Sequence, residues 1–325
     1  MEIPKFLRWS RVVPAPVARR PSPSVVLGFV GTIDPKLIWT TIGDVMSLYN
    51  VAKRLVSHNV DVRIAWTGEL FDLNDLRVTE KDLSVERSDA FVFVCGPIHA
   101  GITPLADKFA GYRRLAVGVS IPQGFDPSCC FDVVVARDSL EDSTFDLALA
   151  DIGYPHFHLD PSSRHGDFAI CLAQQQREYG DANGHSKARE LVVAATEGRD
   201  ARHVQTLLRR DTSHPGLVEL GLQMSRVMIT TRMHGALISA FHGVPSVVID
   251  QVRGGAKVTR IAGKAGIDVL DAWDLTPEEI RKEAETRLSS GPLGERETKM
   301  ARDRITHLSR DALDRSCQAI LDNIS

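Results

Sequence analysis

Short runs of continuously apolar residues recur along this chain, and segments with helical periodicity separate them. The first run, residues 24–30, reads SVVLGFV, and similar runs follow at 61–66, 90–95, 114–119 and 131–136. None of them alternates apolar with polar residues, as a half-exposed strand would. Continuous apolar runs of this length are typical of strands that helices cover on both faces. The pattern therefore predicts an α/β fold with a parallel sheet.

The segment after the first run predicts a helix that begins beside a polar turn. Its apolar residues at 45, 48, 51, 52, 55 and 56 have helical spacing. Asp44 is well suited to cap this helix, because a carboxylate can accept hydrogen bonds from first-turn amides.

A second β/α series follows residues 151–167, which are rich in His, Pro, Ser and Gly and which we interpret as a linker. From residue 276 the chain is charged and periodic, which predicts two long helices. Strands in the second series are expected at 167–172, 203–208, 226–230, 246–250 and 267–270.

Length favours two domains, because 325 residues are about twice the usual single-domain size. We expect an N-terminal domain at 24–160 and a C-terminal domain at 161–325, after a basic arm at 1–23. Both are predicted to be Rossmann-like and doubly wound. By analogy they would face a shared cleft, the arrangement called GT-B.

Composition excludes several classes of protein. The net charge is −3, with 39 Lys and Arg against 42 Asp and Glu, so there is no basic excess of the kind that nucleic-acid binding requires. The five cysteines are odd in number and lack CxxC spacing, which favours buried thiols in a reducing compartment over disulfides or a zinc site. No apolar run approaches the ~20 residues of a membrane span.

These features favour a cytoplasmic protein. The basic arm has no apolar segment of the secretory type and is expected to be poorly ordered. Weak contact of the arm with anionic lipid at the inner face of the membrane is an alternative. Composition does not decide between a monomer and a homo-oligomer.

The most informative stretch is the polar turn between the strand at 226–230 and a strongly apolar helix. Arg232 offers a planar fork suited to carboxylate or phosphate. His234 can exchange a proton near neutral pH. Open α/β sheets bind ligands at the carboxyl ends of their strands, and a helix N-terminus presents free N–H groups to an anion. The turn therefore predicts a site for a small anionic substrate; the alternative is an Arg and a His that only cap carbonyls and form ion pairs.

The string Ile229-Thr230-Thr231-Arg232-Met233-His234-Gly235-Ala236 is followed by the apolar helix, Gly243-Val244-Pro245, a strand and Lys257. Together these resemble the signature of the polysaccharide pyruvyl transferase family. Weaker similarities are found at Thr41-Ile42-Gly43-Asp44, at Val94-Cys95-Gly96-Pro97, at Gly118-Val119-Ser120-Ile121 and at Val135-Ala136-Arg137-Asp138-Ser139. Met233 replaces the usual Leu, and the Cys95 turn is less glycine-rich than the family's.

The resemblance implies transfer of the enolpyruvyl carbons of phosphoenolpyruvate onto two hydroxyls of a sugar, in a polysaccharide or a lipid-linked glycan precursor. The products are a cyclic pyruvate ketal and phosphate. Phosphoenolpyruvate is a co-substrate on the C-terminal side, the acceptor lies on the N-terminal side, and no other cofactor or metal is inferred. The candidate catalytic residues are His234 as general acid/base, Arg232 to orient the donor and Asp44 as base. The candidate substrate-binding residues are Arg137, Lys257, Thr231, Met233, Gly43, Gly96 and His99.

Two other functions stay open. A GT-B glycosyltransferase with a nucleotide-sugar donor would need an acidic motif for the donor ribose, and the region directly after Pro245, residues 246–267, offers only Asp250 and basic residues. A non-catalytic glycan-binding relative is the other alternative. Structural alternatives also stand for single residues: Asp44 as a plain cap, Arg137 in an ion pair, and His242 as a satisfied helix-end histidine.

Overall fold

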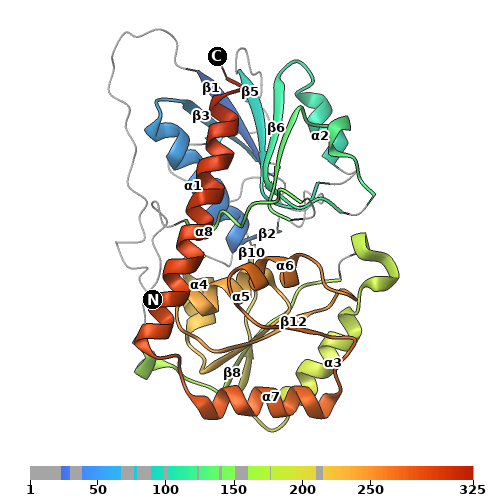
Figure 1. The fold of residues 1–325 in the computed structure, drawn as a ribbon, viewed down its shortest axis with the longest axis vertical. Coiled ribbons are helices and arrows are strands. Elements are labelled where there is room, and N and C mark those ends of the chain that lie inside the picture. Colours follow the sequence, from blue (N-terminus) through green and yellow to red (C-terminus); the bar gives the residue numbers. More distant parts are fainter. Residues whose placement is uncertain are drawn as a thin grey trace. The chain divides into compact units, whose positions relative to one another are not determined.

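The computed structural model describes residues 23–29, 39–66, 77–78, 89–98, 102–122, 124–138, 141–150, 160–175, 177–209 and 215–324. The chain divides into two compact α/β units, whose elements are labelled in Figure 1. Unit 1 consists of Met1–Pro155, Leu207–Ser213 and Ser309–Ser325, and unit 2 of His156–Thr206 and His214–Leu308.

Unit 1 is built on a six-stranded sheet in the order β4-β3-β1-β5-β6-β7, and all its neighbouring strands are parallel. The chain order reverses beside β1, which pairs with β3 on one side and β5 on the other. The strands are β1 (Ser24–Phe29), β3 (Asp61–Trp66), β4 (Arg77–Val78), β5 (Ala90–Val94), β6 (Arg113–Val119) and β7 (Val133–Ala136). The doubly wound parallel sheet expected from the apolar runs is thus present.

The N-cap of helix α1 (Ile42–Ser57) lies three residues before the expected cap, Asp44. Thr41, the last residue of β2 (Trp39–Thr41), caps the helix by accepting a hydrogen bond from the Asp44 amide. The expectation that Asp44 is the cap is therefore wrong. Asp44 lies inside the first turn, where its carboxylate accepts from the Thr41 hydroxyl at 2.6 Å. The apolar face of α1 is buried, as its periodicity predicts.

The core of unit 1 lies between the sheet and its helices. Phe91 of β5 stacks on Phe109, which follows α2 (Thr103–Lys108), with ring centroids 4.0 Å apart. A short 3₁₀ helix, η3 (Pro127–Cys129), lies in the connection from β6 to β7.

Two segments from late in the chain complete unit 1. β10 (Leu207–Arg209) pairs antiparallel with β2, whereas β9 (Ala201–His203) belongs to the sheet of unit 2. The single strand expected at 203–208 is therefore two strands. The end of α8 (Glu295–Leu321) also belongs to unit 1, where Arg310 donates to the Ala150 carbonyl at 2.9 Å and Asp314 pairs with Arg54.

Unit 2 has a five-stranded parallel sheet in the order β13-β12-β11-β8-β9. Its chain order reverses between β8 and β11. The strands besides β9 are β8 (Phe168–Cys171), β11 (Val227–Thr230), β12 (Ser246–Asp250) and β13 (Val269–Asp271). The strand expected at 246–250 is confirmed residue by residue, and the others differ by one or two positions.

Helices cover the sheet of unit 2. Side chains of α3 and α7, which lie side by side (Figure 1), form one core cluster with the sheet, including Leu191, Ile229, Ile249 and Ile280. A capping box of Thr276 and Glu279 begins α7, the first of the two expected C-terminal helices. The helices of this unit are α3 (His185–Thr196), α4 (Pro215–Gln223), α5 (Met233–Phe241), α6 (Lys257–Lys264), α7 (Pro277–Ser290) and the first part of α8. Within the described part of the chain, no helix combines the length and the apolar character needed to cross a membrane.

Candidate functional site

In unit 2 the polar turn after β11 is tied to the end of β8, its neighbour across the reversal point. Thr230 pairs in register with Cys171, and its hydroxyl donates to the Cys171 carbonyl at 2.8 Å. The Thr231 hydroxyl accepts from the Ala173 amide at 2.7 Å. Both threonines are buried. The turn is therefore held on both strands before the helix begins.

Arg232 and His234 stand on this fixed turn. Arg232 is the extended N-cap residue of α5, and its Nε donates to the Leu172 carbonyl at 3.0 Å. His234 lies in the first turn of α5 and is 8% exposed. Gly235 lets the helix approach the strand, because a Cβ there would lie 2.5 Å from Oγ1 of Thr230. The turn with Arg232 and His234 lies at the carboxyl edge of the sheet, beside the point where the strand order reverses. Open α/β sheets bind ligands at this place.

The other predicted residues of unit 2 lie on this turn or on the neighbouring helix α6. Met233 and Thr231 are 4% and 1% exposed, so their side chains position the turn from inside. Lys257 is the first residue of α6, a helix in contact with α5. His242, at the far end of α5, has its Nε2 2.5 Å from Oε1 of the buried Glu219, as expected for a satisfied histidine.

The carboxylates of the acidic residues at the ends of β12 and β13 accept hydrogen bonds from backbone amides. The Asp250 carboxylate is fully buried and accepts from the amides of Val252, Ala256 and Thr259, and from the Thr259 hydroxyl. Asp271 accepts from the amides of Gly254 and Trp273. These carboxylates shape the turns that lead into α6 and away from β13.

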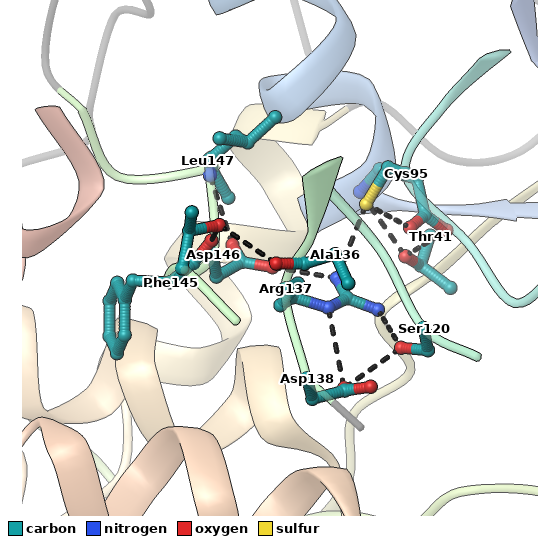
Figure 2. A network of polar contacts seen from close by, with 12 residues as sticks. Thr41, Cys95, Ser120, Ala136, Arg137, Asp138, Phe145, Asp146 and Leu147 are labelled. Atoms are coloured by element: carbon teal, nitrogen blue, oxygen red, sulfur yellow. Dashed lines mark hydrogen bonds and ion pairs between the residues drawn. The ribbon is translucent and has the colours of Figure 1, made fainter. Parts of the chain in front are cut away.

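Unit 1 carries a buried polar network at the carboxyl ends of β5, β6 and β7 (Figure 2). Its centre is Arg137, which is 2% exposed. The guanidinium donates to Asp146 at 2.7 Å, to the Ser120 hydroxyl at 2.8 Å and to the Cys95 sulfur at 3.3 Å. Asp138 lies 3.7 Å from Nε. Arg137 is thus paired with two carboxylates inside the unit, as the structural alternative, an ion pair, predicts.

Cys95 links this network to Asp44 at the start of α1. Cys95 follows β5 with φ of 63°, and its Sγ donates to Asp44 Oδ1 at 3.1 Å. Burial raises the pKa of the Cys95 thiol, in spite of the nearby Arg137, so the group stays a protonated donor. Asp44 is half-buried and is held by this thiol and by the Thr41 hydroxyl. The network therefore holds the Asp44 carboxylate at the carboxyl edge of the sheet of unit 1.

The remaining predicted residues of unit 1 are Gly43, Gly96 and His99. Gly43 is buried in the first turn of α1, and Gly96 has φ of 80°, a value that favours glycine. His99 and Ser139 lie outside the described residues.

Three members of the network were not predicted as site residues. Cys95 and Ser120 stand in the segments with weaker family similarity and could have been proposed, because each follows an apolar strand run at a carboxyl end. Asp146 gave no signal, since it lies in an irregular, largely apolar segment far from any predicted strand end. Among the described residues, no group of three or more His, Cys, Asp or Glu is arranged to hold a metal ion.

Comparison with known proteins bears on the fold. No protein-family model matches the sequence, and the curated proteins give no match. Solved structures are similar: the spinosyn rhamnosyltransferase SpnG, complexed with thymidine diphosphate, has a TM-score of 0.51 at 14% identity, covering 91% of this chain and 100% of its own. UDP-GlcNAc 2-epimerase from Neisseria meningitidis, bound to UDP-GlcNAc, has a TM-score of 0.54 at 9% identity, covering 92% and 100%. The expected GT-B-like fold class of two doubly wound α/β units is confirmed.

Proposed function

We propose that this chain is a transferase that moves a group from a phosphate-bearing donor to a hydroxyl of a sugar. The observation that carries the proposal is the placement of Arg232 and His234 on one rigid turn, at the reversal point of unit 2 and at the N-terminus of α5. A guanidinium and helix amides recognise an anion, and an imidazole exchanges protons. These are the groups that such a transfer requires.

The residues favour phosphoenolpyruvate as the donor. The string from Ile229 to Ala236 resembles the pyruvyl transferase signature. The buried Asp250 carboxylate already accepts from three backbone amides and the Thr259 hydroxyl, which makes it a poor partner for a donor ribose. In this reaction a sugar hydroxyl adds to C2 while a general acid protonates C3. Phosphate then leaves with the C2–O bond electrons, and a second hydroxyl closes the ketal. We assign the proton transfer at C3 to His234, worth ~10²–10⁴-fold in rate, and donor orientation to Arg232.

The solved structures favour a nucleotide sugar, which is our second candidate donor. The two similar proteins above carry thymidine diphosphate and UDP-GlcNAc. For this donor Arg232 and the α5 amides would hold the diphosphate, and His234 would serve as acid or base at the transferred sugar.

A binding and turnover experiment separates the two donors. Purified protein is titrated calorimetrically with phosphoenolpyruvate, with UDP and thymidine diphosphate, and with the corresponding nucleotide sugars. Phosphate release from phosphoenolpyruvate and sugar transfer from the nucleotide sugars are then followed with a panel of acceptor glycosides. Acceptor-dependent phosphate release from phosphoenolpyruvate supports the first donor, whereas sugar transfer from a nucleotide supports the second.

Variants test the site itself. Arg232→Ala should abolish binding of whichever donor is active, while Arg202→Ala, at an exposed arginine of β9, should leave it unchanged. Binding of neither donor class by the folded protein, or equal binding by Arg232→Ala, would refute the proposal. For Asp44, proposed as the acceptor base, Asp44→Asn should lower turnover and leave donor affinity unchanged.

A further inference from the structure

Two neighbouring cysteines in unit 1 have their sulfur atoms in contact. Cys129 ends η3 and Cys130 follows it, and their Sγ atoms are 3.4 Å apart. Both are free thiols in the connection from β6 to β7. That connection begins at Ser120, and Arg137 follows β7, the strand to which it leads; both residues are members of the buried network.

The two thiols differ in access to solvent. Cys129 is exposed, and its sulfur donates to the Asp126 carbonyl at 3.1 Å. Cys130 is 1% exposed, packs in the core cluster that contains Phe131, and has its sulfur 3.5 Å from Oγ1 of Thr103. The sequence-based expectation of buried thiols is therefore wrong for Cys129. One sulfur can meet a small oxidant in solution, and the other is held beside it.

We propose that Cys129 and Cys130 form a reversible oxidation site, at which a hydroperoxide converts the two thiols into a disulfide between adjacent residues. An accessible sulfur with a second thiol next to it is the arrangement of reversible redox cysteines. The site is independent of the proposed transferase activity.

The reaction proceeds in two balanced steps. The Cys129 thiolate attacks one peroxide oxygen, the O–O bond breaks, and the other oxygen leaves with the electron pair as water or an alcohol after protonation. The resulting sulfenic acid is attacked by the Cys130 sulfur. The S–S bond forms, the S–O bond breaks, and the hydroxyl leaves as water with the proton of Cys130. Two thiols are oxidised and one peroxide is reduced.

Adjacency makes this disulfide easy to reverse. Neighbouring Cα atoms across a trans peptide are about 3.8 Å apart, below the ~4.4–6.8 Å of ordinary disulfides, and such deviations make the bond more reducible. We therefore expect a small added thiol to restore the dithiol.

The rate should depend on pH in a defined direction. The hydrogen bond with Cys130 raises the pKa of the Cys129 thiol above its usual value. Since the thiolate is the nucleophile, oxidation should be slow near neutral pH and should accelerate as the pH rises.

Mass spectrometry tests the proposal on the full-length protein. The native protein is treated with stoichiometric hydrogen peroxide. It is then denatured in the presence of an alkylating agent, which traps the remaining thiols, and digested with trypsin. Cleavage after Arg114 and Arg137 gives a peptide of residues 115–137 that holds both cysteines and no other. We expect this peptide to be unalkylated and lighter by about 2 Da, the mass of the two hydrogens lost in disulfide formation. Treatment with dithiothreitol before alkylation should restore two alkylated thiols.

Single variants separate this route from other oxidations. Cys129→Ser should leave Cys130 reduced and alkylated, and Cys130→Ala should stop at oxygen adducts of Cys129, each about 16 Da heavier. Cys317→Ser, at a buried cysteine elsewhere in unit 1, should keep the mass loss in the peptide. Oxygen adducts in place of the mass loss in the wild type, or disulfide-linked dimers, would overturn the proposal.

Discussion

Arg232 Nε donates to the Leu172 carbonyl at 3.0 Å, and the two residues are 60 positions apart in the chain. This bond joins the residues that follow β11 and β8, the strands between which the chain order of unit 2 reverses. The side chain that we propose for anion recognition is thereby held by the residue that follows a neighbouring strand. Such support keeps a binding group in its productive geometry.

Arg232→Lys tests whether the guanidinium geometry matters beyond its charge. Lysine keeps the positive charge but replaces the planar fork with a flexible point charge, and it has no Nε donor for Leu172. We expect donor affinity to fall more than about tenfold, which corresponds to about 1.4 kcal/mol. Calorimetric titration measures the loss, and undiminished affinity in Arg232→Lys would show that charge alone suffices.

His234→Gln tests the proton-transfer role in the first turn of α5. Glutamine preserves hydrogen bonding but does not titrate, so the turnover number should fall about 10²–10⁴-fold while donor affinity changes little. Steady-state kinetics with saturating donor gives the comparison. His203→Gln, at an exposed histidine of β9, is the matched control and should behave as wild type. Wild-type turnover in His234→Gln would remove His234 from the mechanism.

Gly235→Ala tests the close approach of α5 to β11. The new Cβ would lie 2.5 Å from Oγ1 of Thr230, so strand and helix must separate, at a cost of about 1–3 kcal/mol in unfolding free energy. In a Thr230→Ala background that cost should shrink, which a double-mutant cycle by urea denaturation measures.

A helical glycine with open surroundings provides the control. A Cβ at Gly263 in α6 would have nothing within 4 Å, so Gly263→Ala should stabilise the protein by about 0.5–1 kcal/mol. Equal destabilisation by the two alanines would contradict the role given to Gly235.

Arg137→Met tests the buried network of unit 1. Methionine leaves Asp146 and Asp138 buried without their cation, and breaking a buried pair in this way costs about 3–5 kcal/mol. Urea denaturation should show the loss, whereas Arg199→Met, at an exposed ion pair with Glu285, should cost about 0–1 kcal/mol. If both variants lose the same small amount, the network does not hold unit 1 together.

Ionisation of the Cys317 thiol should lower the stability of the protein at alkaline pH. Burial raises the pKa of this thiol from 9.0 to about 12, with Arg54 acting in the opposite direction. Because the folded pKa lies above the unfolded one, the stabilisation is fully present below pH 9 and is lost as the pH rises towards about 12. Compared with Cys317→Ala by urea denaturation, the wild type's advantage should therefore decline across that window. A constant difference between the two proteins would show that the thiol does not titrate this way.

Much of the secondary structure could be predicted from the sequence, because local hydrophobic patterns decide it. The strands at 61–66 and 246–250 agree with the structure at both ends. Element ends were less predictable. Both Thr41 and Asp44 could cap α1, and the choice depends on where β2 ends and how it pairs with β10.

The candidate sites were predictable to different extents. In unit 2, Arg232 and His234 follow an apolar strand and precede an apolar helix, so the turn can be inferred locally. In unit 1, Arg137 could be singled out, but not its partner Asp146, which gives no local signal. Nor could the exposure of Cys129 be separated from the burial of Cys130, because adjacent cysteines have the same local sequence.

Local sequence is therefore enough to specify the parallel α/β class, the two series of strands and helices, and the Arg-Met-His turn. These depend on the apolar or polar character of residues close together in the chain. Three further features emerge only when the chain has folded: Leu172 holds Arg232, Arg137 is paired inside unit 1, and residues 309–325 belong to unit 1. Each of these depends on contacts between residues that are neighbours only after the strands have paired and their helices have packed.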